Sequence, residues 1–145
     1  MKLVVQRVLD ATLKINNNIT AQIKNGLVCF IGFTEGDQNK DYTKAISKLT
    51  GLRVFEDYDG KMNLNLSQIN GELLIIPNFT LYADCSHGFR PSFINALKPT
   101  DAKPCFEKFV NLTKQTFTNT FCGVFGADMK ITQTNDGPIT IVMEF

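Results

Sequence analysis

Apolar and polar positions change their period several times along the chain, and these changes divide it into strands and helices. Lys2–Leu9 and Leu13–Ile23 are rich in β-branched and apolar residues, which favours strands. The polar run Asn16–Asn18, between apolar flanks, predicts a hairpin turn. Gly26–Phe33 is apolar almost throughout, as expected of a strand covered on both faces. The first quarter of the chain is therefore predicted to be β-structure.

Helical spacing replaces this pattern in two segments. From Gln38 to Leu52 the apolar side chains recur on one helix face, and Gly51 helps to end the element. A second helix is predicted to begin at Pro99–Asp101 with Thr100 as its N-cap. Apolar side chains keep one face of that helix apolar as far as Phe117.

Shorter strand patterns fill the rest of the chain. Leu73–Ile76 is predicted to be a buried strand that Pro77 stops, and three further strands are expected at Phe121–Phe125, Asp128–Gln133 and Ile139–Phe145. No repeat or linker interrupts the order of elements. We expect one α+β domain over residues 1–145, with a mixed or antiparallel sheet and two main helices.

Composition places the chain among ordinary globular proteins. It has 145 residues, of which 43% are hydrophobic and 20% charged, and this suits one domain. The longest apolar run, Gly26–Phe33, is far shorter than the roughly 20 residues of a membrane helix. The opening residues are too polar for a signal peptide. We therefore expect a cytoplasmic protein without a membrane span.

Charge gives no global attraction to nucleic acid, because the formal net charge is only +1. A polyanionic partner would have to meet a local patch. Two lysine series are candidates: Lys40, Lys44 and Lys48, spaced at four residues on the first predicted helix, and a second series on the other helix, formed by Lys98, Lys103, Lys108 and Lys114. A solvated helix face is the alternative interpretation.

Cysteine and histidine usage argues against a metal site. Cys29, Cys85, Cys105 and Cys122 are widely spaced, and His87 is the only histidine. We expect free thiols and no metal or organic cofactor. Cys85 lies in a polar loop and is the one cysteine with the setting of a reactive thiol.

Familiar catalytic motifs are absent or poorly placed. A Ser-His-Asp triad would need His87, which lies in a polar loop typical of a solvated histidine. Gly32–Gly36 lacks the Gly-Lys-Ser/Thr ending of a phosphate-binding loop. The carboxylates of Glu56–Asp59 precede Gly60 and indicate an exposed turn.

Thr80 is a stronger candidate, because it follows a predicted buried strand. The amides of Phe79 and Thr80 would lie at the strand end, where fixed N–H groups can stabilise an oxyanion in acyl transfer. Threonine also favours strands for packing reasons, so a purely structural role is the alternative.

Gly137 and Pro138 stand at the mouth of the last predicted strand. Proline cannot donate to a strand ladder and glycine weakens a strand interior, so the backbone here is expected to be bent or at an edge. A tight turn and a functional loop both fit the local sequence.

Taken together, several ordered segments resemble the D-aminoacyl-tRNA deacylases, also called D-tyrosyl-tRNA deacylases. The resemblance covers the whole chain and implies the deacylase fold, a barrel-like α+β domain. The segments that carry it are Leu3–Val8, Leu52–Asp57, Gly60–Asn63, Gly88–Phe93, Phe125–Met129 and Asn135–Thr140.

The resemblance implies hydrolysis of the ester between a D-amino acid and the terminal adenosine of tRNA, with glycyl-tRNA mischarged on tRNA-Ala as a second substrate. It also implies a homodimer that binds tRNA, and no DNA. A cis Gly137–Pro138 pair would reach into the partner's active site and reject L-aminoacyl groups. Arg7 resembles the arginine that braces this pair, and Met129 and Asn135 are further supporting residues.

By the same resemblance, Asn78, Phe79 and Thr80 line the catalytic pocket. The family usually has Ser-Gln before Phe-Thr-Leu, whereas this chain has Pro77 and Asn78. Proline lacks the serine hydroxyl, and asparagine is one methylene shorter than glutamine. A non-catalytic module that binds the tRNA 3′ end, and a general esterase using Thr80 or Cys85, therefore stay open as alternatives.

Overall fold

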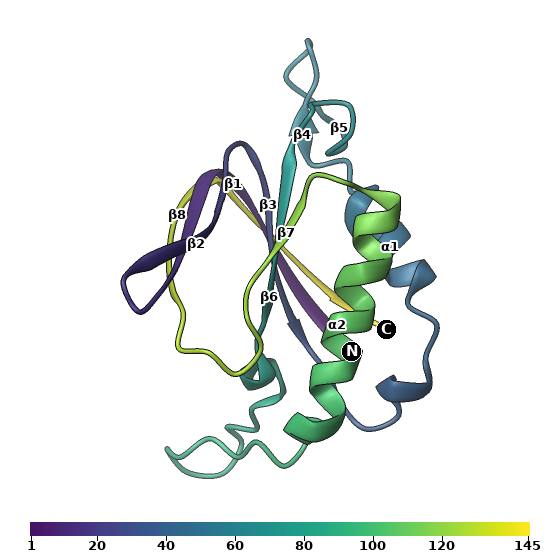
Figure 1. Cartoon of the computed structure of the whole chain (residues 1–145). Helices are drawn as coiled ribbons and strands as arrows, with labels where there is room; N and C mark the ends of the chain where they lie inside the picture. Colours follow the sequence, from purple (N-terminus) through teal and green to yellow (C-terminus); the bar gives the residue numbers. More distant parts are fainter.

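A mixed six-stranded sheet with helices packed against one face forms the protein (Figure 1). The computed structural model describes residues 1–145. The strands are β1 (Lys2–Ile15), β2 (Asn18–Ile23), β3 (Gly26–Gly32), β4 (Phe55–Glu56), β5 (Met62–Leu64), β6 (Glu72–Pro77), β7 (Thr120–Cys122) and β8 (Lys130–Glu144). The helices are η1 (Asp37–Asn39), α1 (Thr43–Thr50), η2 (Phe79–Tyr82) and α2 (Pro99–Thr116). The predicted α+β class with two main helices is confirmed.

β1 is one long strand, and the prediction of two strands separated at residues 10–12 is wrong. Its first half pairs with β3, its second half with β2, and β8 runs antiparallel along almost its full length. Pairing with β2 and β8 keeps residues 10–12 within the strand. The predicted hairpin turn is confirmed between β1 and β2, with Asn16 and Asn17 at positive φ, as two-residue hairpin turns require.

β8 is the other long strand, and two separate strands were predicted in its place. It pairs only with β1 and passes through Gly137 and Pro138, where the register shifts between Gln6 and Asp10. The expected edge position of the Gly-Pro pair is thereby confirmed. Apolar residues on one side of β8 pack against the main core, whereas Val142 on the other side is 61% exposed.

The start of α1 and the N-cap of α2 differ from the prediction, whereas α2 begins at Pro99, within its predicted start. α1 begins at Thr43, later than predicted, and is preceded by the short η1. The N-cap of α2 is Lys98 instead of Thr100, because Pro99 occupies the first helical position, where its fixed φ suits a helix start. The amides of Asp101 and Ala102 donate to the Lys98 carbonyl.

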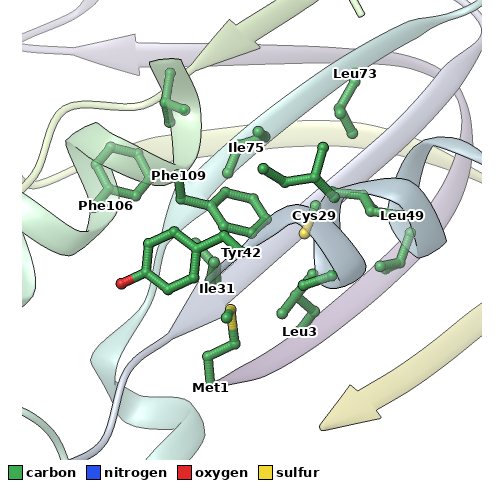
Figure 2. Close-up of a cluster of buried hydrophobic side chains, with 14 of the residues drawn as sticks. Met1, Leu3, Cys29, Ile31, Tyr42, Leu49, Leu73, Ile75, Phe106 and Phe109 are labelled. Carbon is green, nitrogen blue, oxygen red and sulfur yellow. The ribbon is translucent and has the colours of Figure 1, made fainter. Parts of the chain in front are cut away.

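The main core lies between the helices and the sheet (Figure 2). Tyr42, the N-cap of α1, and Phe109 of α2 are fully buried there, and their ring centroids lie 5.7 Å apart. Both rings pack against Ile31 and Ile75 of the sheet (Figure 2). Cys29 is buried in the same cluster, and this burial raises the pKa of its thiol. All four cysteines are free thiols, as predicted. A smaller apolar cluster covers the opposite face of the sheet.

The two chain ends meet beside η1 (Figure 1). The Met1 amino group lies 2.8 Å from both the Asp37 carboxylate and the Phe145 carbonyl, and Lys40 Nζ contacts the same two groups. Burial alone would raise the pKa of Asp37, but hydrogen bonds from Met1, Thr34 and Lys40 lower it overall. Burial lowers the pKa of the Met1 amino group, and its contact with Asp37, which acts in the opposite direction, offsets this only in part.

No helix in the chain combines the length and apolar character needed to cross a membrane.

Candidate functional site

The candidate site begins where two parallel strands end at the same edge of the sheet. β3 pairs with β6 as far as Ile31 and Pro77, and the Asn78 amide then donates to the Ile31 carbonyl at 2.8 Å. Gly32 permits this close approach, since a Cβ there would lie 2.9 Å from the Asn78 carbonyl oxygen. The chain next turns into η2, which places Phe79 at the carboxyl end of the strands, a common location for ligand sites.

Two backbone donors at this edge have no partner in the protein. Phe79 and Thr80 are the first residues of η2, and no acceptor in the chain receives their amide N–H groups. The first turn of a helix always leaves such donors without an intrahelical partner. Both residues are exposed, so the two N–H groups are available to an oxygen of a ligand.

The Thr80 hydroxyl is directed to its neighbour rather than to a base. It donates to the Asn78 side-chain oxygen at 2.5 Å. A carboxamide does not accept a proton at neutral pH, so this contact orients the hydroxyl without activating it. His87 is exposed and makes no hydrogen bond in the structure, in keeping with the prediction of a solvated histidine.

An apolar cavity of about 550 Å³ is lined by Phe79, whereas Asn78 and Thr80, which were also predicted to line the pocket, do not line it. Phe79 and Phe93 meet edge to face at its wall, with centroids 5.1 Å apart. The remaining walls come from Pro77, Ile94, the segment Ala96–Pro99 with Ala102, and Phe125 with Gly126. Such a volume suits a flat organic group.

Met129 lies behind this site, near Pro77. A Cβ at Gly123 would meet Met129 Sδ at 2.7 Å and Pro77 Cδ at 3.3 Å, so both side chains pack on the same glycine. Met129 does not line the cavity itself.

Gly137 and Pro138 lie exposed on β8 and are joined by a cis peptide bond, as the resemblance implies. Arg7 is buried beside them, with its Nε 2.8 Å from Asp136 Oδ2 and its Nη1 donating to the Val54 carbonyl at 2.7 Å. The guanidinium thus ties the residue before the pair to the segment that enters β4.

Asn135 belongs to a small polar network on the same part of the sheet. The Gln133 side-chain amide donates to Asn135 Oδ1 and to Gln6 Oε1, each at 2.7 Å. Gln6 in turn donates to the Thr140 hydroxyl at 3.2 Å. The network links both flanks of the Gly137–Pro138 pair.

Within one chain, the Gly137–Pro138 pair lies far from the amides of Phe79 and Thr80. In the strand register, the Gly137–Pro138 pair lies opposite Arg7 of β1. Arg7 pairs with Leu27 of β3, and Leu27 pairs with Leu73 of β6. Pro77 lies four residues further along β6. Strand geometry then separates the two places by about 13 Å along the strands and about 14 Å across them. The structure does not bring the two predicted parts of the site together in one protomer.

Several residues of the site escaped the sequence patterns. The wall formed by Phe93 and Ile94 was not assigned any role, although exposed apolar residues next to a polar loop are an available signal. Val54 accepts from Arg7 through its backbone carbonyl, a group that every residue has, so the sequence does not mark it. Asp136 contacts Arg7 through its carboxylate, but no local pattern identifies it as the partner.

Other candidates from the sequence lie outside the cavity. Cys85 is exposed and does not line it. Asp57 accepts from the amides of Asp59 and Lys61 and from the Asn63 side chain, and these bonds lower its pKa. This confirms the predicted turn, which spans Asp57–Gly60, whereas Glu56 is the last residue of β4. No three His, Cys, Asp or Glu side chains are grouped as a metal site would need.

Comparison with known proteins connects the whole chain to one family. The family model described as D-Tyr-tRNA(Tyr) deacylase matches residues 4–144. A D-aminoacyl-tRNA deacylase of Clostridium tetani is 44% identical over 144 residues, covering 99% of this chain and 97% of its own. One of Thermotoga petrophila is 42% identical with the same coverage.

Solved structures agree in fold. A c-Myc DNA Unwinding Element Binding Protein superimposes with a TM-score of 0.93 at 31% identity, covering 100% of this chain and 99% of its own. A probable eukaryotic D-amino acid tRNA deacylase gives a TM-score of 0.80 over 98% of this chain and 97% of its own, and at 14% identity it shows the fold alone. From these matches and the ordered motifs, the chain belongs to the D-Tyr-tRNA(Tyr) deacylase family.

Proposed function

We propose that this protein hydrolyses the ester of D-aminoacyl-tRNA and releases the free D-amino acid and tRNA. The observation that carries the proposal is the pair of unused amides, those of Phe79 and Thr80, at the edge of an apolar cavity. Ester hydrolysis develops negative charge on the carbonyl oxygen, which two fixed N–H donors stabilise. The relatives named D-aminoacyl-tRNA deacylase supply the substrate class.

The chemistry needs little from side chains. The terminal adenine occupies the cavity against Phe79, and the ester carbonyl oxygen accepts from the two amides. A water molecule attacks the carbonyl carbon, the bond to the ribose oxygen breaks, and that oxygen takes a proton as it leaves. A neighbouring ribose hydroxyl can assist this proton transfer. Thr80, whose hydroxyl is held by a hydrogen bond to Asn78, positions the ester. It forms no covalent bond with the substrate, because no base faces its hydroxyl.

Two substitutions at one position test the role of the amides. Phe79→Ala removes the ring but keeps the N–H, whereas Phe79→Pro removes both. Proline fits here, since Asn78 is extended (φ −146°, ψ 90°) and the Phe79 amide bonds to nothing in the protein. We expect kcat for D-Tyr-tRNA to be about 100-fold lower in Phe79→Pro than in Phe79→Ala. Equal rates would refute amide catalysis.

We further propose that Gly137 and Pro138 act in the active site of a partner subunit. Their exposure on an edge strand, remote from their own Thr80, supports this arrangement. Backbone carbonyls presented there would leave no room for the side chain of an L-amino acid, whereas D-aminoacyl and glycyl groups fit. Glycyl-tRNA mischarged on tRNA-Ala is therefore a second expected substrate.

A mixing experiment distinguishes sharing between subunits from action within one. In a heterodimer of Phe79→Pro and Gly137→Ala chains, the shared arrangement forms one site with both parts intact. Mixing the two variants should then restore selective hydrolysis of D-Tyr-tRNA to about half the wild-type rate per heterodimer. If each chain served its own site, mixing would restore nothing. Subunit exchange is verified with differently tagged chains.

The edge of β8 supports a homodimer. It is a 15-residue strand with one free edge, and natural proteins seldom leave such an edge unpaired. Light scattering at micromolar concentration should give twice the chain mass of 16.2 kDa. We also propose that the protein acts in the cytoplasm and does not bind DNA. A gel-shift assay with duplex DNA as competitor for tRNA tests the latter.

Two alternatives make different forecasts. A non-catalytic module would bind the tRNA 3′ end but release D-tyrosine from D-Tyr-tRNA no faster than buffer. A general esterase would hydrolyse simple esters and would depend on Thr80 or Cys85. The orientation of Thr80 toward Asn78, and a cavity lining that does not include Cys85, favour the amide mechanism over the esterase.

A further inference from the structure

We propose that Lys98 binds the phosphodiester that joins the terminal adenosine of tRNA to the nucleotide before it. This inference rests on the proposed function, because it takes the apolar cavity beside Phe79 as the adenine pocket. It names the residue that holds the nucleic-acid chain as it enters that pocket.

The charge distribution around the cavity singles out Lys98. Eleven residues line the cavity, seven of them hydrophobic, and Lys98 is the only one with a charge. No carboxylate is among them to repel a phosphate. An adenosine whose base enters an apolar pocket keeps its 5′ phosphate at the mouth, where a single cation is the simplest partner.

The Lys98 side chain is free to take this role. It is exposed and forms no ion pair or hydrogen bond, whereas Lys103, on the same helix, lies 3.9 Å from Glu107. Lys108, further along, lies over the Tyr42 ring and donates to a backbone carbonyl. Lys98 is thus the one lysine that lines the cavity, and its side chain has no ion pair or hydrogen bond.

The backbone of Lys98 is held in place on both sides. The buried Leu97 donates its amide to the Phe33 carbonyl at 2.9 Å, and the Lys98 carbonyl accepts from the amides of Asp101 and Ala102 at 3.0 and 2.9 Å. The Cα is therefore fixed at the start of α2 while the ammonium reaches outward. A fixed origin lowers the entropy lost when the side chain engages an anion.

Other cations are placed less well for this phosphate. Lys44, Lys48 and Arg53 border an open groove, but none of that groove's lining residues also lines the cavity. Arg90 is exposed in the loop before Phe93 and does not line the cavity either. They remain available for more distant phosphates.

A binding cycle isolates the contact. The probes are non-hydrolysable D-tyrosyl amides of 3′-amino-3′-deoxyadenosine, with and without a 5′ phosphate, measured by calorimetry on wild type, Lys98→Gln and the matched control Lys103→Gln. The Lys98 side chain makes no cap hydrogen bond, so its substitution removes no hydrogen bond of the folded state. We expect the phosphate to improve wild-type affinity about fivefold, as one exposed charge-assisted contact would.

Lys98→Gln should reduce this phosphate preference to about one, and Lys103→Gln should keep it. The salt dependence of tRNA binding should also weaken in Lys98→Gln, by about 0.7 in log–log slope for one lost single-strand phosphate contact. A preference that persists in Lys98→Gln, or one that is absent from wild type, overturns the inference. Hydrolysis of D-Tyr-tRNA by the same wild-type preparation tests the proposed function separately.

Discussion

Replacement of Gly137 by alanine is the perturbation whose effect the structure specifies best. Gly137 has φ of +118°, a backbone conformation that L-residues with a side chain rarely adopt. An added Cβ would lie 2.8 Å from both the backbone nitrogen and Cγ1 of Ile139. The nitrogen cannot move away without shifting the Pro138–Ile139 backbone, so the new methyl group must displace the pair itself.

The size of the effect follows from these two penalties. A backbone conformation of this kind and an overlap with main-chain atoms together cost about 3 kcal/mol. At the usual unfolding entropy per residue, a chain of 145 residues loses about 10 °C of Tm for this amount. Gly60→Ala is the matched control, because Gly60 has φ of +72° with nothing within 4 Å and should lose only about 1 kcal/mol, or about 3 °C.

Selectivity provides the functional readout. We expect the ratio of kcat/KM for D-Tyr-tRNA over L-Tyr-tRNA to fall at least tenfold in Gly137→Ala and to stay unchanged in Gly60→Ala. Thermal unfolding and single-turnover deacylation of both tRNAs measure the two effects on the same preparations. If Gly137→Ala kept wild-type selectivity while its Tm fell as expected, the pair would be structural and its role in chirality would be refuted.

Three further predictions concern other parts of the molecule. Asp37→Asn removes the buried partner of the Met1 amino group and should lower the free energy of unfolding by about 3 kcal/mol at pH 7. Because the pKa of Asp37 is lowered in the fold, its contribution is complete at neutral pH and is lost as the pH falls below about 4. Urea titrations between pH 7 and pH 3 should therefore show the two proteins converging, and a constant difference would contradict this. Thr80→Ala and Cys85→Ala should each keep kcat for D-Tyr-tRNA within about tenfold of wild type, since neither side chain is proposed to attack the ester; a loss of about 1,000-fold in either would restore the nucleophile hypothesis. Affinity for uncharged tRNA should fall as salt rises from 50 to 200 mM in a filter-binding assay, whereas a flat response would exclude phosphate contacts.

Local sequence patterns determined the elements whose signals lie within a few residues. The buried strand before Pro77, the hairpin turn at Asn16 and Asn17, and the turn around Asp57 all follow from side-chain alternation or turn chemistry. They were confirmed because neighbours in sequence also decide their backbone conformation. The place of Phe79 and Thr80 shortly after β6 also follows from this local signal, whereas their role in catalysis stays a prediction.

Longer features depended on partners that the sequence does not display. β1 runs unbroken through Asp10, a polar position, because β8 pairs with it there and β2 pairs with it from Ala11 onward. β8 likewise continues past Gly137 and Pro138, since β1 pairs with it on both sides of the register shift. Local propensity is a weak preference, and ladder hydrogen bonds from distant strands override it.

The Gly-Pro pair shows the same division. From the sequence alone, its chemistry indicated a bent or edge-placed backbone, and the ordered motifs indicated the family. Only the tertiary structure placed the pair on an exposed edge with Arg7 bound to Asp136, and at a distance from its own Thr80. It also assembled the cavity from η2, the start of α2 and the segment after β7. Such surfaces arise where segments far apart in the chain meet, because burial and strand register are properties of the packed molecule and not of any one segment.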